Sequence, residues 1–243
     1  MKVTINLSKA TLMGLGAVVA AGLMISGVGL GILIMHPGSS APAPLTTATG
    51  QTGTPSTSPS PSGTAPHSPF TVGKAFAFQT SVDTLSGHRT VLARGSKATV
   101  IMAMASWCLY CGYEDKWVLP VLAKTPGVAI DIIDVSPQGG IADPGPKSPA
   151  FSGHDGTGGA LTVSGMETTM RQYKKTFGTL NAPNIHIYIA PSATQQAWNI
   201  QSFPTIAWVN AAGRIAHATP GGMTLTGAQS ELRQVLASKS GQN

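Results

Sequence analysis

Cysteine is nearly absent from this chain, which has only 2 in 243 residues. Both belong to a single Cys-x-x-Cys motif, formed by Cys108 and Cys111. A small domain held together by several disulfides is therefore excluded, because such frameworks need more cysteines. Two interpretations of the pair remain, a local redox couple or half of a metal site.

Charged residues are also few, at 10% of the chain. The 15 Lys and Arg exceed the 9 Asp and Glu, which gives a net charge of +6. The basic residues are nevertheless scattered, and Lys174 and Lys175 are the only adjacent pair. Nucleic-acid binding is not expected, because it normally requires a clustered basic patch.

Charge is missing altogether from residues 11–35, which are almost entirely apolar or small. A run of this length can span a bilayer as one helix. Lys2 and Lys9 precede the run and no Lys or Arg follows it before Lys74, so the positive-inside rule places residues 1–10 in the cytoplasm. We expect a single-pass anchor in the cell membrane, with the remaining chain extracytoplasmic. The alternative is a cleaved signal peptide, whose apolar core is usually shorter.

Residues 36–69 contain no Lys, Arg, Asp or Glu and few large apolar side chains. A segment rich in Pro, Ser, Thr and Gly cannot bury enough apolar surface to offset the entropy of ordering. This composition predicts an extended linker between the membrane anchor and the rest of the chain.

Residues 70–243 have the composition of one globular domain, and hydrophobic periodicity predicts its strands. Residues 98–105 form an apolar run suited to a strand that is buried on both faces. Other strands are expected at 128–135, 185–189, 205–210 and 214–218, and two short ones on either side of a turn at 85–88.

Helical patterns separate these strands. A helix is expected over residues 108–124, with a kink at Pro120. A capping box of Ser164 and Glu167 indicates the start of another helix, and a last one is expected over 227–238. Together with the strands, these helices predict an α/β sandwich with a central mixed β-sheet flanked by helices.

The Cys-x-x-Cys motif falls between the apolar run and the first helix. A sulfur at the first turn of a helix lies over unpaired backbone N–H groups and the positive end of the helix dipole, which favours the thiolate. We therefore expect Cys108 to be the exposed nucleophile and Cys111, one turn later, to be the buried resolving thiol. Neither a cofactor nor a metal is expected, because no further cysteines and no paired histidines complete a zinc site.

Several short motifs follow one another along the domain: Val72-Gly73-Lys74, a hairpin turn at Gly87, Ser106-Trp107-Cys108-x-x-Cys111-x-x-Glu114, Ser202-Phe203-Pro204-Thr205, and Gly213. Over about residues 70–240 the chain thereby resembles the TlpA/ResA-like thioredoxin-fold family. Members of that family are bacterial membrane-anchored thiol-disulfide oxidoreductases. The resemblance implies a thioredoxin-like sandwich for residues 70–243.

The resemblance also implies roles for individual residues. Cys108 and Cys111 would be catalytic, and Pro204 would be a cis-proline facing them. Glu114 would lie beneath the active site and exchange a proton with Cys111. The local sequence alone leaves open that Glu114 is a solvated helix residue beside Asp115. The substrate would lie against residues from two segments: Trp107, Phe203, Pro204 and Thr205.

The expected function is that of an extracytoplasmic thiol-disulfide oxidoreductase. The resemblance implies reduction of disulfides in exported proteins, as in cytochrome c maturation, with electrons from a transmembrane donor. Two alternatives stay open: a disulfide oxidase or isomerase of secreted proteins, and a thioredoxin-fold copper metallochaperone that holds copper between its two thiolates.

A loop at residues 136–164 is rich in Gly and Pro and longer than this fold requires. Loops of this length are usually functional or disordered, so contact with partners is expected here. His154 and Asp155 within it are interpreted as solvated residues in preference to a pair of metal ligands.

Overall fold

The structure, a computed structural model, describes residues 68–146 and 152–238. The predicted cytoplasmic segment (1–10), the anchor (11–35) and all of the linker except residues 68–69 lie outside these ranges. None of the helices within the two ranges has the length and apolar character of a membrane span.

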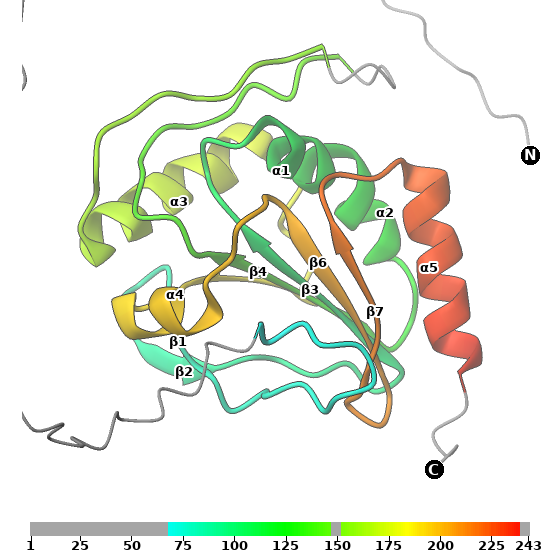
Figure 1. Ribbon diagram of the computed structural model, residues 1–243. Coiled ribbons are helices and arrows are strands. Elements are labelled where there is room, and N and C mark those ends of the chain that lie inside the picture. The colour runs from blue at the N-terminus through cyan, green and yellow to red at the C-terminus, as the bar shows by residue number, and fades with distance from the viewer. Residues whose placement is uncertain (1–67, 147–151, 239–243) are drawn as a thin grey trace, which may run out of the picture. The chain divides into compact units, whose positions relative to one another are not determined.

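Seven strands form one mixed sheet in the spatial order β2-β1-β5-β4-β3-β6-β7 (Figure 1). Its centre consists of three parallel strands: β3 (Ala98–Met104), β4 (Val128–Asp134) and β5 (Ile185–Ile189). Antiparallel strands extend the sheet on both sides: β1 (Ser81–Thr84), β2 (Arg89–Val91), β6 (Thr205–Asn210) and β7 (Ile215–Pro220). The mixed sheet predicted from the sequence is confirmed.

Every residue of β3 is buried, as the apolar run at 98–105 predicted, and every residue of β4 is buried as well. The two strands are parallel and in register, so that Met104 at the end of β3 lies beside Asp134 at the end of β4. Their carboxyl ends therefore meet at one edge of the sheet. The segment that follows β3 carries Cys108, so this edge positions the candidate site.

Helices cover both faces of the sheet (Figure 1). On one face a large core includes residues of α1 (Leu109–Tyr113), α2 (Leu119–Leu122), α3 (Val163–Phe177) and α5 (Leu225–Ala237). On the other face a smaller core packs around Trp198, the last residue of α4 (Ser192–Trp198). Two rings from the start of the domain contact Trp198 edge-on, Phe70 at 5.6 Å and Phe76 at 6.3 Å between centroids. α4 was not predicted, because its polar sequence shows no helical period.

The start predicted for α3 was wrong by about half a turn. The residue that caps the helix is Thr162, whose hydroxyl accepts a hydrogen bond from the Gly165 N–H at 3.1 Å. Ser164 lies inside the helix, and the Glu167 carboxylate is turned towards Gly87 in the β1–β2 turn. Thr and Ser hydroxyls cap helices in the same way, so the local sequence does not show which of Thr162 and Ser164 is the cap. The course of the preceding loop decides it.

The helix expected over 108–124 is divided into three parts. Between α1 and α2, residues Glu114–Val118 form a π-helical turn, η1, in which the Leu119 N–H bonds to the Glu114 carbonyl five residues earlier. Pro120 has no N–H to continue the regular pattern, and the interruption lies directly before it. As a result the consecutive residues Glu114 and Asp115 are both fully buried.

Carboxyl groups are buried inside the sheet as well. Asp131 and Asp134 lie on β4, and burial raises the pKa of each from 3.8 to about 8. The Ser136 N–H donates to Asp134 Oδ1 at 3.1 Å and lowers its pKa in part. A buried carboxyl with a raised pKa retains its proton in the folded state at pH values where the unfolded chain has lost it.

We predict that Asp131→Asn makes the domain more stable at pH 8 while changing its stability little at pH 4. Because the folded pKa lies above the unfolded one, the wild-type free energy of unfolding falls as the pH rises from about 4 to about 8. The gain at pH 8 should be at least about 1 kcal/mol, since one pKa unit corresponds to about 1.4 kcal/mol. Urea unfolding at both pH values measures it, and a gain of equal size at pH 4 and pH 8 would contradict the argument.

Candidate functional site

Cys108 is the N-cap residue of α1. Its backbone is extended, with φ −79° and ψ 121°, and its sulfur accepts a hydrogen bond from the Cys111 N–H at 3.4 Å. Both cysteines are free thiols. The sulfur thus takes the place that a Ser or Asp side chain occupies at other helix starts.

The expectation that Cys108 is exposed was wrong. Its relative exposure is only 4%, and that of Cys111 is 0%. The backbone carbonyl of Phe203 lies 3.5 Å from the Cys108 sulfur and accepts its S–H hydrogen bond, so the loop before β6 covers the thiol. This loop is distant in sequence, and only the sheet brings it beside α1. A disulfide must therefore approach Cys108 closely against Phe203.

The two thiols have opposite acidities. The hydrogen bond from the Cys111 thiol is the main cause that lowers the pKa of Cys108, and the backbone N–H groups of Cys111 and Tyr110 lower it further. Burial and the Asp155 carboxylate act in the opposite direction. Burial, followed by the interaction with Cys108, raises the pKa of Cys111 well above its usual value. Cys108 is consequently the more readily ionised thiol of the pair.

Four residues predicted to contact substrate lie on the two segments that flank Cys108. The Phe203–Pro204 peptide bond is cis, and Trp107 meets Phe203 edge-on with ring centroids 5.8 Å apart. The Trp107 Nε1–H donates to Ser136 Oγ at 3.0 Å, which fixes the indole. Thr205 begins β6, and its hydroxyl donates to the Ser202 carbonyl at 2.7 Å. Tyr110, which lies within the Cys-x-x-Cys motif and was not predicted as a site residue, is 43% exposed.

Glu114 is fully buried, and its hydrogen bond is to the segment before α5. Its Oε1 accepts a hydrogen bond from the Met223 N–H at 2.6 Å, in the segment before α5. Burial raises its pKa to about 8, with the Met223 bond acting against the shift and the Asp115 charge adding to it. Neither cysteine is among these causes. The hydrogen bond between Glu114 and Met223 thus connects η1 to the segment before α5.

Asp115 is the buried acid within electrostatic reach of both thiols. Its Oδ2 accepts a 2.6 Å hydrogen bond from the hydroxyl of Tyr173 on α3. Burial raises the pKa of Asp115 to about 8, Tyr173 opposes the shift, and Cys108 adds to it. Asp115 in turn contributes, after burial and Cys108, to the raised pKa of Cys111. Sequence reasoning missed this residue, because Asp115 stands in a charged run that looks solvated without the π-turn.

The loop expected at 136–164 folds back as two arms that run beside each other (Figure 1). Its contacts with the motif include two backbone hydrogen bonds: the Gly156 N–H donates to the Trp107 carbonyl at 2.7 Å, and the Ala142 N–H donates to the Ser106 carbonyl at 3.0 Å. His154 lies 4.0 Å from Asp143 across the arms. Within residues 68–146 and 152–238, no three His, Cys, Asp or Glu side chains are grouped as metal ligands.

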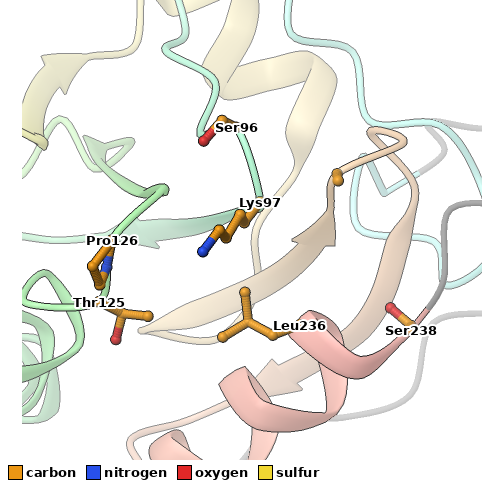
Figure 2. A pocket seen from close by; sticks show the side chains of 7 residues that line it. Ser96, Lys97, Thr125, Pro126, Leu236 and Ser238 are labelled. Atoms are coloured by element: carbon orange, nitrogen blue, oxygen red, sulfur yellow. The ribbon is translucent and has the colours of Figure 1, made fainter.

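A cavity of about 500 Å³ lies at the opposite end of β3 (Figure 2). It is bordered by Ser96 and Lys97, which precede β3, and by residues at the end of α5, whereas the cysteines follow β3. Figure 2 shows the Lys97 side chain extending into the space between Pro126 and Leu236. None of the residues around this cavity contacts the thiols, so it is separate from the candidate site.

The mixed sheet, the Cys-x-x-Cys at the start of a helix after a central strand, and the cis-proline before the next antiparallel strand define a thioredoxin-like α/β fold. No protein-family model matches this chain. No curated protein matches it either.

Solved structures with a similar fold include three from microorganisms. A thioredoxin-like protein from Aeropyrum pernix is 17% identical, with 64% of this chain and 88% of that chain covered and a TM-score of 0.44. A secreted disulfide oxidoreductase of Mycobacterium tuberculosis, homologous to E. coli DsbE, is 17% identical, with 65% and 96% covered and a TM-score of 0.45. A thiol:disulfide interchange protein from Chlorobium tepidum is 16% identical, with 65% and 92% covered and a TM-score of 0.42. Likenesses at this level do not identify a function.

We predict that an alkylating reagent at limiting dose labels Cys108 before Cys111 in the reduced, folded protein. The lowered pKa of Cys108 and the raised pKa of Cys111 both favour this order, and the difference should be at least about tenfold in rate. Peptide mass spectrometry after quenching measures both rates. Because both thiols are buried, labelling in urea provides the control, and there the two rates should converge.

Proposed function

We propose that this chain is a thiol-disulfide oxidoreductase that works through Cys108 and Cys111. The observation that carries the proposal is the pairing of a helix-capping thiol of lowered pKa with a fully buried thiol of raised pKa. A nucleophile and a protected resolving group are what disulfide exchange requires. A structural pair of buried cysteines would need no such difference in acidity.

The exchange proceeds in two displacements. The Cys108 thiolate attacks one sulfur of the substrate disulfide, forming a mixed disulfide and releasing the other sulfur as a thiolate, which takes up a proton. Cys111 then loses its proton and attacks the Cys108 sulfur, which releases the second substrate thiol. Two electrons have passed from the cysteine pair to the substrate, and the protein holds a Cys108–Cys111 disulfide. The same steps in reverse oxidise a dithiol.

The second displacement requires a proton acceptor, because burial holds Cys111 in its protonated form. We assign this role to Asp115 in place of the predicted Glu114, because Asp115 interacts electrostatically with the thiols and Glu114 does not appear among the causes of their altered acidity. The Asp115 charge contributes to the raised pKa of Cys111, Cys108 contributes to the raised pKa of Asp115, and the Tyr173 hydroxyl holds the Asp115 carboxylate in place at 2.6 Å. With a pKa of about 8, an ionised fraction of Asp115 is present at neutral pH and increases as the pH rises.

The substrate segment would lie across the surface formed by Trp107, Tyr110 and Phe203, with Pro204 itself buried. These side chains supply aromatic and apolar contact beside Cys108, and Tyr110 is the most exposed of them. The Phe203 carbonyl, which accepts the Cys108 S–H bond in this structure, becomes available to a backbone donor when Cys108 reacts. Thr205 contributes by holding the turn at Ser202.

We further propose that the physiological direction is reduction of disulfides in exported proteins. The Asp155 charge and burial oppose ionisation of Cys108, but the hydrogen bonds from Cys111 and Tyr110 outweigh them and lower its pKa, whereas the pKa of Cys111 is raised. Stabilising the thiolate is what makes a dithiol pair oxidising, so the opposite acidities of the two thiols do not set the direction, and the support for reduction is the resemblance to the TlpA/ResA-like family. A standard potential near about −270 mV would agree with a reductant, whereas one near about −120 mV would support the oxidase alternative.

The location proposed for this domain is outside the cytoplasm, attached to the membrane by residues 11–35. Support comes from the sequence, where Lys2 and Lys9 precede the uncharged segment. Partners would then be exported proteins, including apocytochromes c, and a transmembrane electron donor, because cytoplasmic thioredoxins cannot cross the bilayer.

We predict that Cys111→Ser traps a covalent complex with the substrate protein, because the mixed disulfide on Cys108 can no longer be resolved. Affinity purification followed by non-reducing electrophoresis detects the complex, and mass spectrometry identifies the trapped protein. An apocytochrome or another exported disulfide protein supports the reductase, whereas a broad set of secreted proteins supports the oxidase.

Cys108→Ser is the matched control and should trap nothing, since it removes the attacking sulfur and leaves Cys111 buried. In vitro, the wild-type chain should catalyse insulin reduction and both variants should lose it. The metallochaperone hypothesis would replace the oxidoreductase hypothesis if the wild-type chain failed to reduce insulin and bound copper only when both cysteines were present.

We predict that Asp115→Asn slows resolution of the mixed disulfide by about a hundredfold, the usual contribution of a positioned base. Asparagine keeps an oxygen for the Tyr173 hydroxyl, so the fold should be retained. In the wild type the rate should rise with pH through about 8, and this rise should be absent in the variant. Glu114→Gln is the matched comparison and should keep the pH dependence of the resolution rate. If Glu114→Gln loses this pH dependence while Asp115→Asn keeps it, the proton acceptor is Glu114.

A further inference from the structure

Asp155 brings a carboxylate to the helix start that carries Cys108. Its Oδ1 accepts a hydrogen bond from the Leu109 N–H at 2.7 Å, one residue beyond the nucleophile. Asp155 belongs to the loop at 136–164 and lies 46 positions after Leu109 in the sequence. The carboxylate and the Cys108 sulfur therefore accept hydrogen bonds from neighbouring N–H groups of the same helical turn.

The loop is built so that this contact is maintained. Its arms are joined by reciprocal backbone hydrogen bonds between Asp143 and His154, at 3.1 and 2.9 Å, and by the Gly139 N–H bond to the Gly159 carbonyl at 2.8 Å. Directly after Asp155, Gly156 donates to the Trp107 carbonyl, and a side chain at this glycine would lie 2.5 Å from the Ile141 carbonyl oxygen. Close backbone packing on both sides thus fixes where Asp155 lies.

Asp155 is exposed, whereas the other ionisable side chains that interact electrostatically with Cys108 are buried. Those groups are Cys111 and Asp115 on the same helical segment and Tyr173 on α3. Among the described residues, no Lys, Arg or His contributes to the lowered pKa of Cys108. An arriving disulfide therefore meets one exposed negative charge beside the nucleophile.

We propose that Asp155 is a specificity-determining residue, whose carboxylate makes Cys108 react preferentially with disulfides that carry positive charge near the reacting sulfur. The inference deepens the proposed oxidoreductase function and rests on it. Its substrate class would be disulfide segments in which Lys or Arg flanks the cysteine. A cation near the sulfur is attracted by the Asp155 carboxylate as the mixed disulfide forms, while an anionic segment is repelled.

The size of the preference follows from exposure. Interactions of solvent-exposed charges are worth at most about 1 kcal/mol, which corresponds to about a threefold to fivefold change in rate. They also weaken with salt, because the screening length falls from about 10 Å at 0.1 M to about 3 Å at 1 M. Loss of the preference at high salt is therefore expected.

The test uses the full-length reduced chain and three small disulfides of similar size. Cystamine is cationic, bis(2-hydroxyethyl) disulfide is neutral, and dithiodiglycolate is anionic. We predict that the ratio of the rate constants for cystamine and dithiodiglycolate falls about threefold or more in Asp155→Asn. Asparagine keeps an oxygen for the Leu109 N–H, and Asp155→Ser provides a second neutral variant. Ratios cancel any change in the intrinsic reactivity of Cys108, which each variant also alters.

Asp143→Asn is the matched control, because it removes the same charge from the same loop, at a side chain that is 60% exposed and whose partners are His154 and the Gly145 N–H. It should keep the wild-type ratio. An unchanged ratio in both Asp155 variants, with the fold intact by circular dichroism, would overturn the inference. The inference would also be overturned if Asp143→Asn changed the ratio of rate constants as much as Asp155→Asn, because the change would then come from the net charge of the protein.

A second readout separates this inference from the proposed function. Iodoacetamide is neutral and iodoacetate is anionic, and both alkylate Cys108 whether or not the protein exchanges disulfides. Asp155→Asn should raise the rate with iodoacetate relative to iodoacetamide by about threefold. If this ratio changes while no disulfide reacts, the charge effect of Asp155 holds and the oxidoreductase fails. If disulfides react but neither ratio changes, the oxidoreductase holds and the inference fails.

Discussion

The hydrogen bond between the Cys111 N–H and the Cys108 sulfur is the interaction on which the site depends. It makes the nucleophile part of the helix start and holds the sulfur in place, and it adds to the larger effect of the Cys111 thiol in lowering the pKa of Cys108. The geometry follows from β3, which is buried on both faces and ends directly before the motif. An error in the register of β3 would move Cys108 away from Phe203 and from the loop at 136–164.

Burial of negative charge is the second constraint. Glu114, Asp115, Asp131 and Asp134 are all fully enclosed, and burial raises the pKa of each to about 8. Isolated carboxylates would be very unfavourable at these positions, so they are held as neutral acids over much of the physiological range. For Asp115 this state has a use, because a carboxyl that titrates near neutral pH can exchange a proton with a buried thiol. For Asp131, no catalytic use is apparent from its position in the sheet.

The π-turn and the loop at 136–164 act on the same helical segment from opposite sides. η1 turns Asp115 inward, where Tyr173 holds it, and the loop brings Asp155 to the outer side, at the Leu109 N–H. One acid is buried and affects the resolving thiol, whereas the other is exposed and affects what approaches the nucleophile. In the proposed mechanism, proton transfer and substrate choice are therefore assigned to different carboxylates.

Local patterns in the sequence determined most of the framework. The buried strands, the turn at Gly87 and the position of Cys108 between strand and helix were all predictable, because apolar periodicity and the spacing of two cysteines are local properties. Tertiary structure decided which acids meet the thiols. Asp115 resembles a solvated residue until Pro120 and the π-turn place it inside, and Asp155 reaches Leu109 only through the fold of a long loop. The burial of Cys108 by Phe203 likewise depends on strand order, since contacts between distant segments leave no periodic trace in the sequence.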